Sequence, residues 1–126
     1  MKVLRIPCFV LLLLLTLSLF NCVSVSKRCH SWEAAIDSID ENTVAQHWDV
    51  AAADLEHLYQ DWAECQTWFH IVIEHKEIDA AEALLQRCRI LCQEKDAVEF
   101  RSTLADLRSQ MALLDEMQQI SIKNVM

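Results

Sequence analysis

Hydrophobic residues form one continuous run at the start of the chain and separate helical stripes after it. Residues 6–25 are almost entirely apolar, with Lys2 and Arg5 before them and Lys27 and Arg28 after them. At a rise of about 1.5 Å per residue, a run of about 20 residues matches the ~30 Å hydrocarbon core of a bilayer. The pattern predicts a helix that spans a membrane and contacts its lipid.

Two processed forms are alternatives to a retained anchor. A cleavable signal would end at Ser24-Val25-Ser26, and a lipoprotein signal would use Leu19-Phe20-Asn21-Cys22. We favour the anchor because the run exceeds the apolar core of about 7–15 residues typical of a signal peptide, and because Phe20 and Asn21 are bulky for a lipoprotein site. Although the flanking bases are nearly balanced, we expect the N-terminus inside, so that residues 29–126 are extracytoplasmic.

A heptad stripe predicts the longest helix after this run. One seam of the stripe contains Trp48, Leu55, Trp62 and Phe69. The other seam contains Ala51, Leu58, Cys65 and Val72. Such a stripe predicts a helix from about Val44 to Glu74 whose a/d face is buried against other helices. Trp68 lies one position off the stripe, so we expect it to be less buried than Trp62.

Three further stripes have the same helical spacing. The first contains Cys29, Trp32, Ile36 and Ile39, the second Ile78, Ala81, Leu85, Cys88 and Cys92, and the third Phe100, Leu104, Leu107, Met111 and Leu114. The chain has no Gly and one Pro, Pro7, so turns of the kind that β-hairpins need are hard to build. We therefore predict an all-α protein: a signal anchor over residues 1–28, then an antiparallel bundle of three to four helices over residues 29–126.

Capping boxes predict where three helices begin. Each box places an acceptor three residues before Gln or Glu, and the three are Thr43 to Gln46, Asp79 to Glu82 and Asp96 to Glu99. The expected helix starts are near Val44, between Glu77 and Ala80, and near Ala97. A short helix from about Cys29 to Glu41 would precede them.

The charge of the predicted bundle is strongly acidic. From Lys27 onward there are nine Lys or Arg and nineteen Asp or Glu, and between Cys29 and His75 there are ten acids and no Lys or Arg. A solvated helix surface accounts for this, and a cationic partner is the alternative. We expect no nucleic-acid binding, which needs clustered bases, and we expect anionic lipid to repel the domain.

The cysteines permit two interpretations. Cys8 and Cys22 lie in the membrane run, and Cys29, Cys65, Cys88 and Cys92 lie in the bundle. Cys88 and Cys92 share one helix face and do not suit a disulfide with each other. The four bundle cysteines therefore form one or two bridges between helices, or they are small buried hydrophobic residues.

A polar cluster at one predicted helix junction is the best candidate site. Glu74, His75, Glu77 and Asp79 lie within six residues, and His70 is one turn earlier. Imidazole and carboxylates can hold a divalent metal or act as an acid–base pair. The alternative is that they cap two helix ends. Since no nucleophilic triad or paired Glu-x-x-His motif is present, we expect no enzyme, no cofactor and no firm metal site.

Several segments together resemble a known family. They are Trp48 with Ala52, Leu55, Leu58 and Trp62, then Ile73 through Asp79, Leu104 and Leu107, and Ile120 through Met126. With them the chain resembles the bacterial family catalogued as domain of unknown function 4363. The resemblance implies a short protein with an N-terminal membrane segment and a helical remainder, and it implies no activity.

These inferences lead to one functional expectation and two alternatives. We expect a membrane-anchored extracytoplasmic helical bundle that serves as a structural or protein-interaction module. The first alternative is an accessory subunit of a membrane protein complex. The second is a metal- or small-ligand-binding domain centred on His75.

Overall fold

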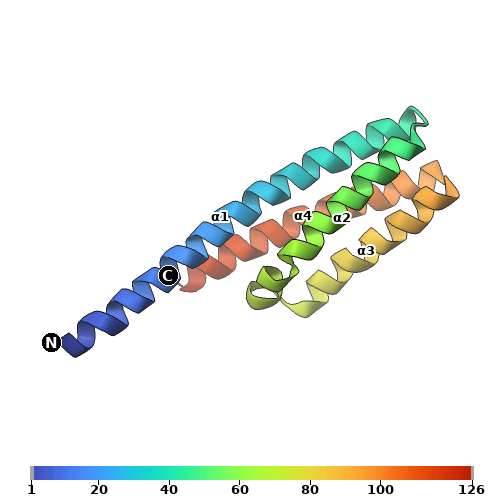
Figure 1. Ribbon diagram of the computed structural model, residues 1–126. Helices are drawn as coiled ribbons and strands as arrows, with labels where there is room; N and C mark the ends of the chain where they lie inside the picture. The colour runs from blue at the N-terminus through green and yellow to red at the C-terminus, as the bar shows by residue number, and fades with distance from the viewer. Residues whose placement is uncertain (1, 126) are drawn as a thin grey trace.

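The computed structural model describes residues 2–125 and contains four helices and, within those residues, no strand. They are α1 (Lys2–Val44), α2 (Trp48–Val72), α3 (His75–Glu94) and α4 (Ala97–Val125). Successive helices run in opposite directions, as Figure 1 shows. The prediction of an all-α antiparallel bundle is confirmed. Met126, the last residue used for the family resemblance, lies outside the described residues.

The helices are arranged in a ring around one core. Helix α1 packs against α2 and α4, and α3 packs against the same two helices. Helices α1 and α3 make no contact within residues 2–125, so they lie at opposite corners of the bundle. The turns that follow α1 and α3 lie at one end, and the α2–α3 turn lies toward the other (Figure 1).

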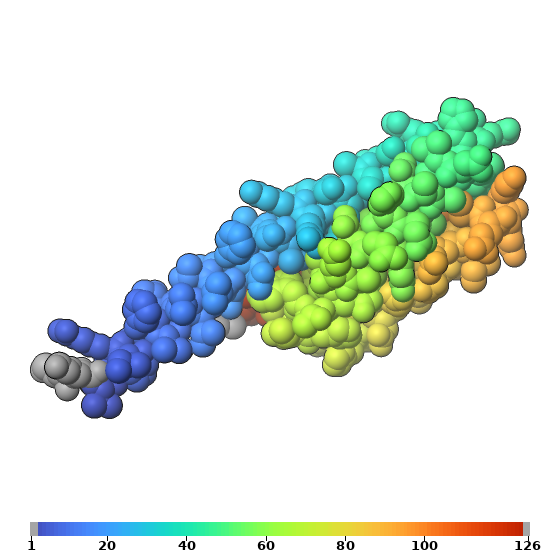
Figure 2. Space-filling view, viewed as in Figure 1, coloured from blue at the N-terminus to red at the C-terminus, as the bar shows by residue number. Residues whose placement is uncertain are grey.

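Helix α1 is continuous from the apolar run into the bundle. The short helix predicted from Cys29 to Glu41 is the last part of α1, and no break occurs at residue 28. The N-terminal part of α1 projects alone from the bundle (Figure 2), with exposed apolar side chains such as Ile6 and Phe9. By length and composition, this helix could cross a membrane. A signal sequence near an N-terminus meets the same two criteria.

The bundle begins inside the apolar run. The last turns of α4 lie beside α1 (Figure 1), and Cys22 and Val25 are each only 7% exposed. Just beyond them the Ser26 hydroxyl donates a 2.6 Å hydrogen bond to the Asp115 carboxylate of α4. Residues at the end of the apolar run therefore contribute to the bundle core.

Two turns use left-handed residues that are not glycine. Gln46 has φ 62° after α1, and Lys95 has φ 57° after α3. In both turns the next amide bonds to a carbonyl five residues back, from His47 to Asn42 and from Asp96 to Leu91. These are Schellman-type helix ends, which usually place Gly at the left-handed position.

The first predicted capping box is wrong. Thr43 lies in the last turn of α1, and its hydroxyl donates to the Ile39 carbonyl rather than accepting from a following amide. Helix α2 begins at Trp48, after His47, which makes no side-chain cap. A threonine hydroxyl can bond back to the carbonyl four residues earlier, and here that local option prevails.

The other two boxes have different outcomes. Helix α3 begins at His75, earlier than the predicted start, so Asp79 and Glu82 lie within it and Asp79 caps nothing. Helix α4 begins at Ala97 as predicted, and an Asp96 carboxylate oxygen accepts from the Glu99 amide at 3.3 Å. Helix α2 ends at Val72 rather than Glu74, because the backbone of the buried Ile73 is extended.

The heptad prediction is confirmed at the centre of α2. Its buried residues are Ala51, Leu55, Leu58, Trp62, Cys65 and Phe69. Trp62 is fully buried between Trp32 and Phe69, with ring centroids 6.1 and 5.5 Å away. The end positions Trp48 and Val72 are half-buried against the same core.

Trp68 is half-buried against the core and less buried than Trp62. Its ring N–H donates a 2.7 Å hydrogen bond to the side-chain amide oxygen (Oε1) of Gln118, and Gln118 is fully buried in α4. Trp68 therefore links α2 to α4, a contact that the heptad did not indicate.

Candidate functional site

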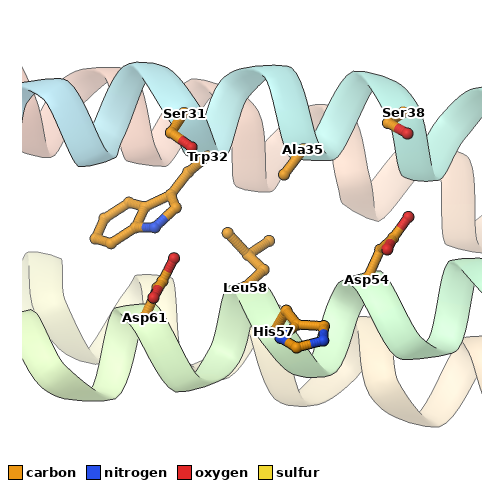
Figure 3. A pocket seen from close by; sticks show the side chains of 8 residues that line it. All are labelled: Ser31, Trp32, Ala35, Ser38, Asp54, His57, Leu58 and Asp61. Atoms are coloured by element: carbon orange, nitrogen blue, oxygen red, sulfur yellow. The ribbon is translucent and has the colours of Figure 1, made fainter.

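A groove between α1 and α2 is the best candidate site (Figure 3). It encloses about 290 Å³ and is lined by Ser31, Trp32, Ala35 and Ser38 of α1 and by Asp54, His57, Leu58 and Asp61 of α2. Trp32 and Leu58 form its floor between the helices, and the two aspartates project from α2 on either side of Leu58 (Figure 3).

Small side chains on α1 open this groove. Ser31, Ala35 and Ser38 are four and three residues apart, which places them on one face of the helix. Larger residues at these positions would fill the space above Trp32 and Leu58. The groove therefore depends on the small size of these side chains of α1.

Trp32 has an unusual polar atom at the floor of the groove. Its side chain is 1% exposed, and its Nε1 is the one buried side-chain nitrogen or oxygen within residues 2–125 that lacks a hydrogen-bond partner. Its nitrogen lies on the ring edge turned toward α2 (Figure 3). Buried indole N–H groups usually have an acceptor. Trp62 and Trp68 do, at 2.7 Å each.

The groove is negatively charged. Asp54 and Asp61 make no ion pair or side-chain hydrogen bond among the described residues, whereas neighbouring acids of α2 are paired. Glu64 lies 3.2 Å from Arg28, and Glu56 lies 3.3 Å from Arg89. The two aspartates are seven positions apart, which corresponds to a rise of about 10 Å along the helix. Two unpaired carboxylates about two turns apart suit a ligand with two cationic groups.

The predicted cluster at the α2–α3 junction is only partly assembled. The Nδ1 atoms of His70 and His75 are 2.9 Å apart, and both side chains are exposed. Glu77 instead bonds to Gln110 of α4, which donates to its carboxylate at 3.0 Å and to its carbonyl at 2.9 Å. Glu74 immediately precedes α3, and its carbonyl accepts from the Glu77 amide.

The geometry gives this junction little capacity for a metal ion. Asp79 is exposed on α3 and, within residues 2–125, makes no hydrogen bond or ion pair with either histidine. Within residues 2–125 no group of three or more His, Cys, Asp or Glu side chains is arranged to hold a metal. The two histidines instead connect the end of α2 to the start of α3, and the Glu74 carbonyl accepts from the first turn of α3.

Glu82 is the centre of a polar network that the sequence did not indicate. Its carboxylate accepts hydrogen bonds from Trp62 at 2.7 Å, from Tyr59 and Gln66 at 3.1 Å and from Gln86 at 3.2 Å. Burial raises the pKa of Glu82, but these hydrogen bonds and the charge of Arg89 outweigh burial and leave the pKa below its usual value. The network joins α2 to α3.

A second network joins α1 to α4 near the projecting helix. The Asp115 carboxylate accepts from Ser26 at 2.6 Å, from Gln118 at 2.9 Å and from Gln119 at 3.3 Å. The His30 ring lies 3.9 Å from its other oxygen. In the sequence Ser26 belongs to the candidate cleavage site, and in the structure it joins this network.

All six cysteines are free thiols. Cys29, Cys65, Cys88 and Cys92 are buried in the core, so the interpretation as small hydrophobic residues is confirmed and bridges between them are not formed. Burial raises the pKa of each of these thiols, and it raises that of Cys88 to about 12.

Sequence signals for the groove exist but are weak. Ser31, Ala35 and Ser38 repeat at helical spacing, and Asp54 and Asp61 are seven residues apart. Each pattern is common on exposed helix faces, and neither predicts which two helices will be neighbours. The unpaired Trp32 N–H depends on three-dimensional packing and leaves no pattern in the sequence.

Comparisons with known proteins place the chain in a family. No curated protein and no solved structure matches it. A family model described as "Domain of unknown function" with the number 4363 matches residues 19–125. The match includes the whole bundle and the end of the apolar run. The chain therefore belongs to the family of domain of unknown function 4363.

Proposed function

We propose that this chain is a single-pass membrane protein whose extracytoplasmic bundle docks a cationic segment of a partner protein in the α1–α2 groove. The exposed apolar side chains in the first part of α1 support the anchor. In water they would form a large apolar surface on a projecting helix, whereas a bilayer would cover them. A partner within a membrane complex would make the chain an accessory subunit.

The packing at the end of the apolar run supports a retained anchor. Signal cleavage at Ser24-Val25-Ser26 would cut α1 where Val25 is buried and where Ser26 bonds to Asp115. It would also remove Cys22 from the core. Cleavage would thus break a continuous helix inside the folded bundle.

The observation that carries the docking proposal is the unpaired Trp32 N–H beside two unpaired aspartates. A protein segment supplies both complements, because its backbone carbonyls accept hydrogen bonds and its Lys or Arg side chains pair with carboxylates. The small side chains of α1 allow such a segment to approach closely. A second copy of this chain fits poorly, since each of the five arginines of its bundle already lies within 3.4 Å of a carboxylate.

The anchor is tested by extracting membranes that contain the full-length chain with alkaline carbonate. We expect the protein to remain in the membrane pellet at its full mass of 14.6 kDa. A soluble product that begins near Lys27 would refute the anchor.

Docking is tested with helical peptides that carry two lysines seven residues apart, measured by fluorescence anisotropy with the detergent-solubilised protein. We expect binding that weakens with salt, and a loss of about tenfold in affinity in the double variant Asp54→Asn, Asp61→Asn. The matched control neutralises two exposed acids of other helices, Glu94→Gln and Asp106→Asn, and should bind like the wild type.

Trp32→Phe tests the hydrogen bond separately. We expect lower peptide affinity with little change in the stability of the free protein, because the N–H has no partner to lose. Unchanged affinity with a loss of about 1–3 kcal/mol in stability would mean that the N–H has an acceptor inside the bundle. Equal weakening by the control pair would show that overall charge, and not the groove, attracts the peptide.

A further inference from the structure

A second groove lies between α1 and α4 at the end of the bundle that faces the projecting helix. It encloses about 400 Å³ and is lined by Leu19, Cys22, Val23, Ser26, Lys27 and His30 of α1 and by Gln119, Ile122 and Lys123 of α4. This volume lies in the range of ligand-binding pockets in proteins. Its floor is apolar, and its basic residues come from both helices.

We propose that this groove binds one anionic phospholipid, with an acyl chain along the apolar floor and the phosphate between Lys27 and Lys123. The inference rests on the proposed membrane anchor. It also identifies a ligand class for a surface that the docking proposal does not use, since the α1–α2 groove involves different residues of α1.

The position of the groove along α1 favours a lipid. Leu19, Cys22 and Val23 belong to the apolar run of residues 6–25, whereas Lys27 lies just beyond it. If the run spans the hydrocarbon core, the groove crosses the level at which acyl chains give way to headgroups. Lys27 lies on the headgroup side of this level. Lys123 is one turn beyond Gln119, which bonds to Ser26, so it lies beside the end of the apolar run, and its long side chain can extend from there to the headgroups.

The charges at the rim favour a phosphate. Lys27 and Lys123 are exposed and have no ion-pair partner among residues 2–125, unlike the five arginines of the bundle, each of which is within 3.4 Å of a carboxylate. The domain as a whole is acidic, and we expected anionic lipid to repel it. The end of the bundle that would meet the membrane surface differs from the acidic domain as a whole, because it carries these two unpaired lysines.

One carboxylate lies near the groove and limits where the phosphate can bind. Asp115 is 8% exposed, and Ser26, Gln118 and Gln119 all donate hydrogen bonds to it. These donors direct its charge into the α1–α4 interface. The phosphate would therefore bind at the outer rim, near the two lysines and away from Asp115.

Native mass spectrometry of the full-length protein in detergent tests the proposal, with phosphatidylglycerol and phosphatidylcholine of equal chain length as probes. We expect one phosphatidylglycerol to remain bound, with a preference over phosphatidylcholine of about fivefold for each lysine. The double variant Lys27→Gln, Lys123→Gln should lose this preference. The matched control, Lys76→Gln with Lys95→Gln, should keep it.

Two further measurements separate the sources of binding. Glycerol phosphate has the same headgroup chemistry without acyl chains, and we expect no retention of it; equal retention would indicate a site for a soluble phosphate and overturn the lipid proposal. Equal binding of both lipids by the wild type would also overturn it. Because carbonate extraction reports the anchor independently, failure of the lipid site leaves the anchor result intact.

Discussion

Trp32, Trp62 and Trp68 all pack an indole against the core, but of these three only Trp62 and Trp68 have an acceptor for the ring N–H. Trp62 donates to Glu82 of α3, and Trp68 donates to Gln118 of α4. Each of these bonds joins α2 to a different helix. The N–H group of each of these two rings thus connects α2 to one particular helix, while the apolar surface of the ring packs in the core.

Trp62→Ala should destabilise the protein most. Its ring is fully buried against Trp32 and Phe69, so we expect a loss of about 3–5 kcal/mol in the free energy of unfolding. Trp68→Ala should cost clearly less, because part of that ring is exposed. Urea unfolding followed by circular dichroism gives the order. An equal or larger loss at Trp68 would mean that its bond to Gln118 outweighs the difference in burial.

Glu82 makes the stability depend on pH. Because its pKa is lowered in the folded state, ionised Glu82 contributes stability that is fully present above the ordinary pKa of 4.5 and is lost as pH falls through the folded value. We expect Glu82→Gln to destabilise the protein at pH 7 and to flatten the stability profile below pH 4.5. A profile with the same slope in both proteins would assign the pH dependence to other carboxylates.

At the scale of helices, the sequence predicts the buried face of each helix better than it predicts where the helix begins and ends. The stripes of α2, α3 and α4 predicted the buried residues well, because a helix that packs on one side must repeat its apolar positions at that spacing. The capping boxes predicted one helix start of three. The hydrogen bond from Thr43 to the Ile39 carbonyl and the extended backbone of Ile73 changed the other ends.

A pair of aspartates tests this difference between real and apparent caps. Asp96→Ala removes an acceptor for the Glu99 amide, and we expect a loss of about 1 kcal/mol. Asp79 occupies the same position in its own box but lies within α3 and caps nothing, so Asp79→Ala should change stability by less than about 0.5 kcal/mol. Thermal unfolding of both variants at one pH is sufficient. Similar losses of stability in the two variants would show that Asp79 also acts as a helix cap.

The candidate sites were less predictable than the fold. The acidic segment between Cys29 and His75 suggested a cationic partner, yet nothing in it distinguished Asp54 and Asp61 from their paired neighbours. The cluster around His75 is adjacent in sequence, but Glu77 bonds to Gln110 of α4, and within residues 2–125 Asp79 makes no hydrogen bond or ion pair with the histidines. A site between helices depends on which faces meet, and the stripes do not specify that.

At the scale of the whole molecule, the fold should protect its thiols. Burial raises the pKa of Cys29, Cys65, Cys88 and Cys92, so at pH 7.5 we expect iodoacetamide to label them slowly in the native protein and rapidly in urea. An exposed control, Ser109→Cys on α4, should be labelled at once. Intact mass without reductant checks the free state, since a bridge would make the chain two hydrogens lighter.

The continuity of α1 has a mechanical consequence. From residue 25 to residue 44 the same helix rises about 28 Å beyond the apolar run, with no hinge between them. Membrane helices tilt by about 20° on average and adjust their tilt to bilayer thickness. In a chain anchored as proposed, a tilt of that size would move the far end of the bundle about 10 Å sideways. A change in membrane thickness would therefore shift the position of that end over the membrane surface.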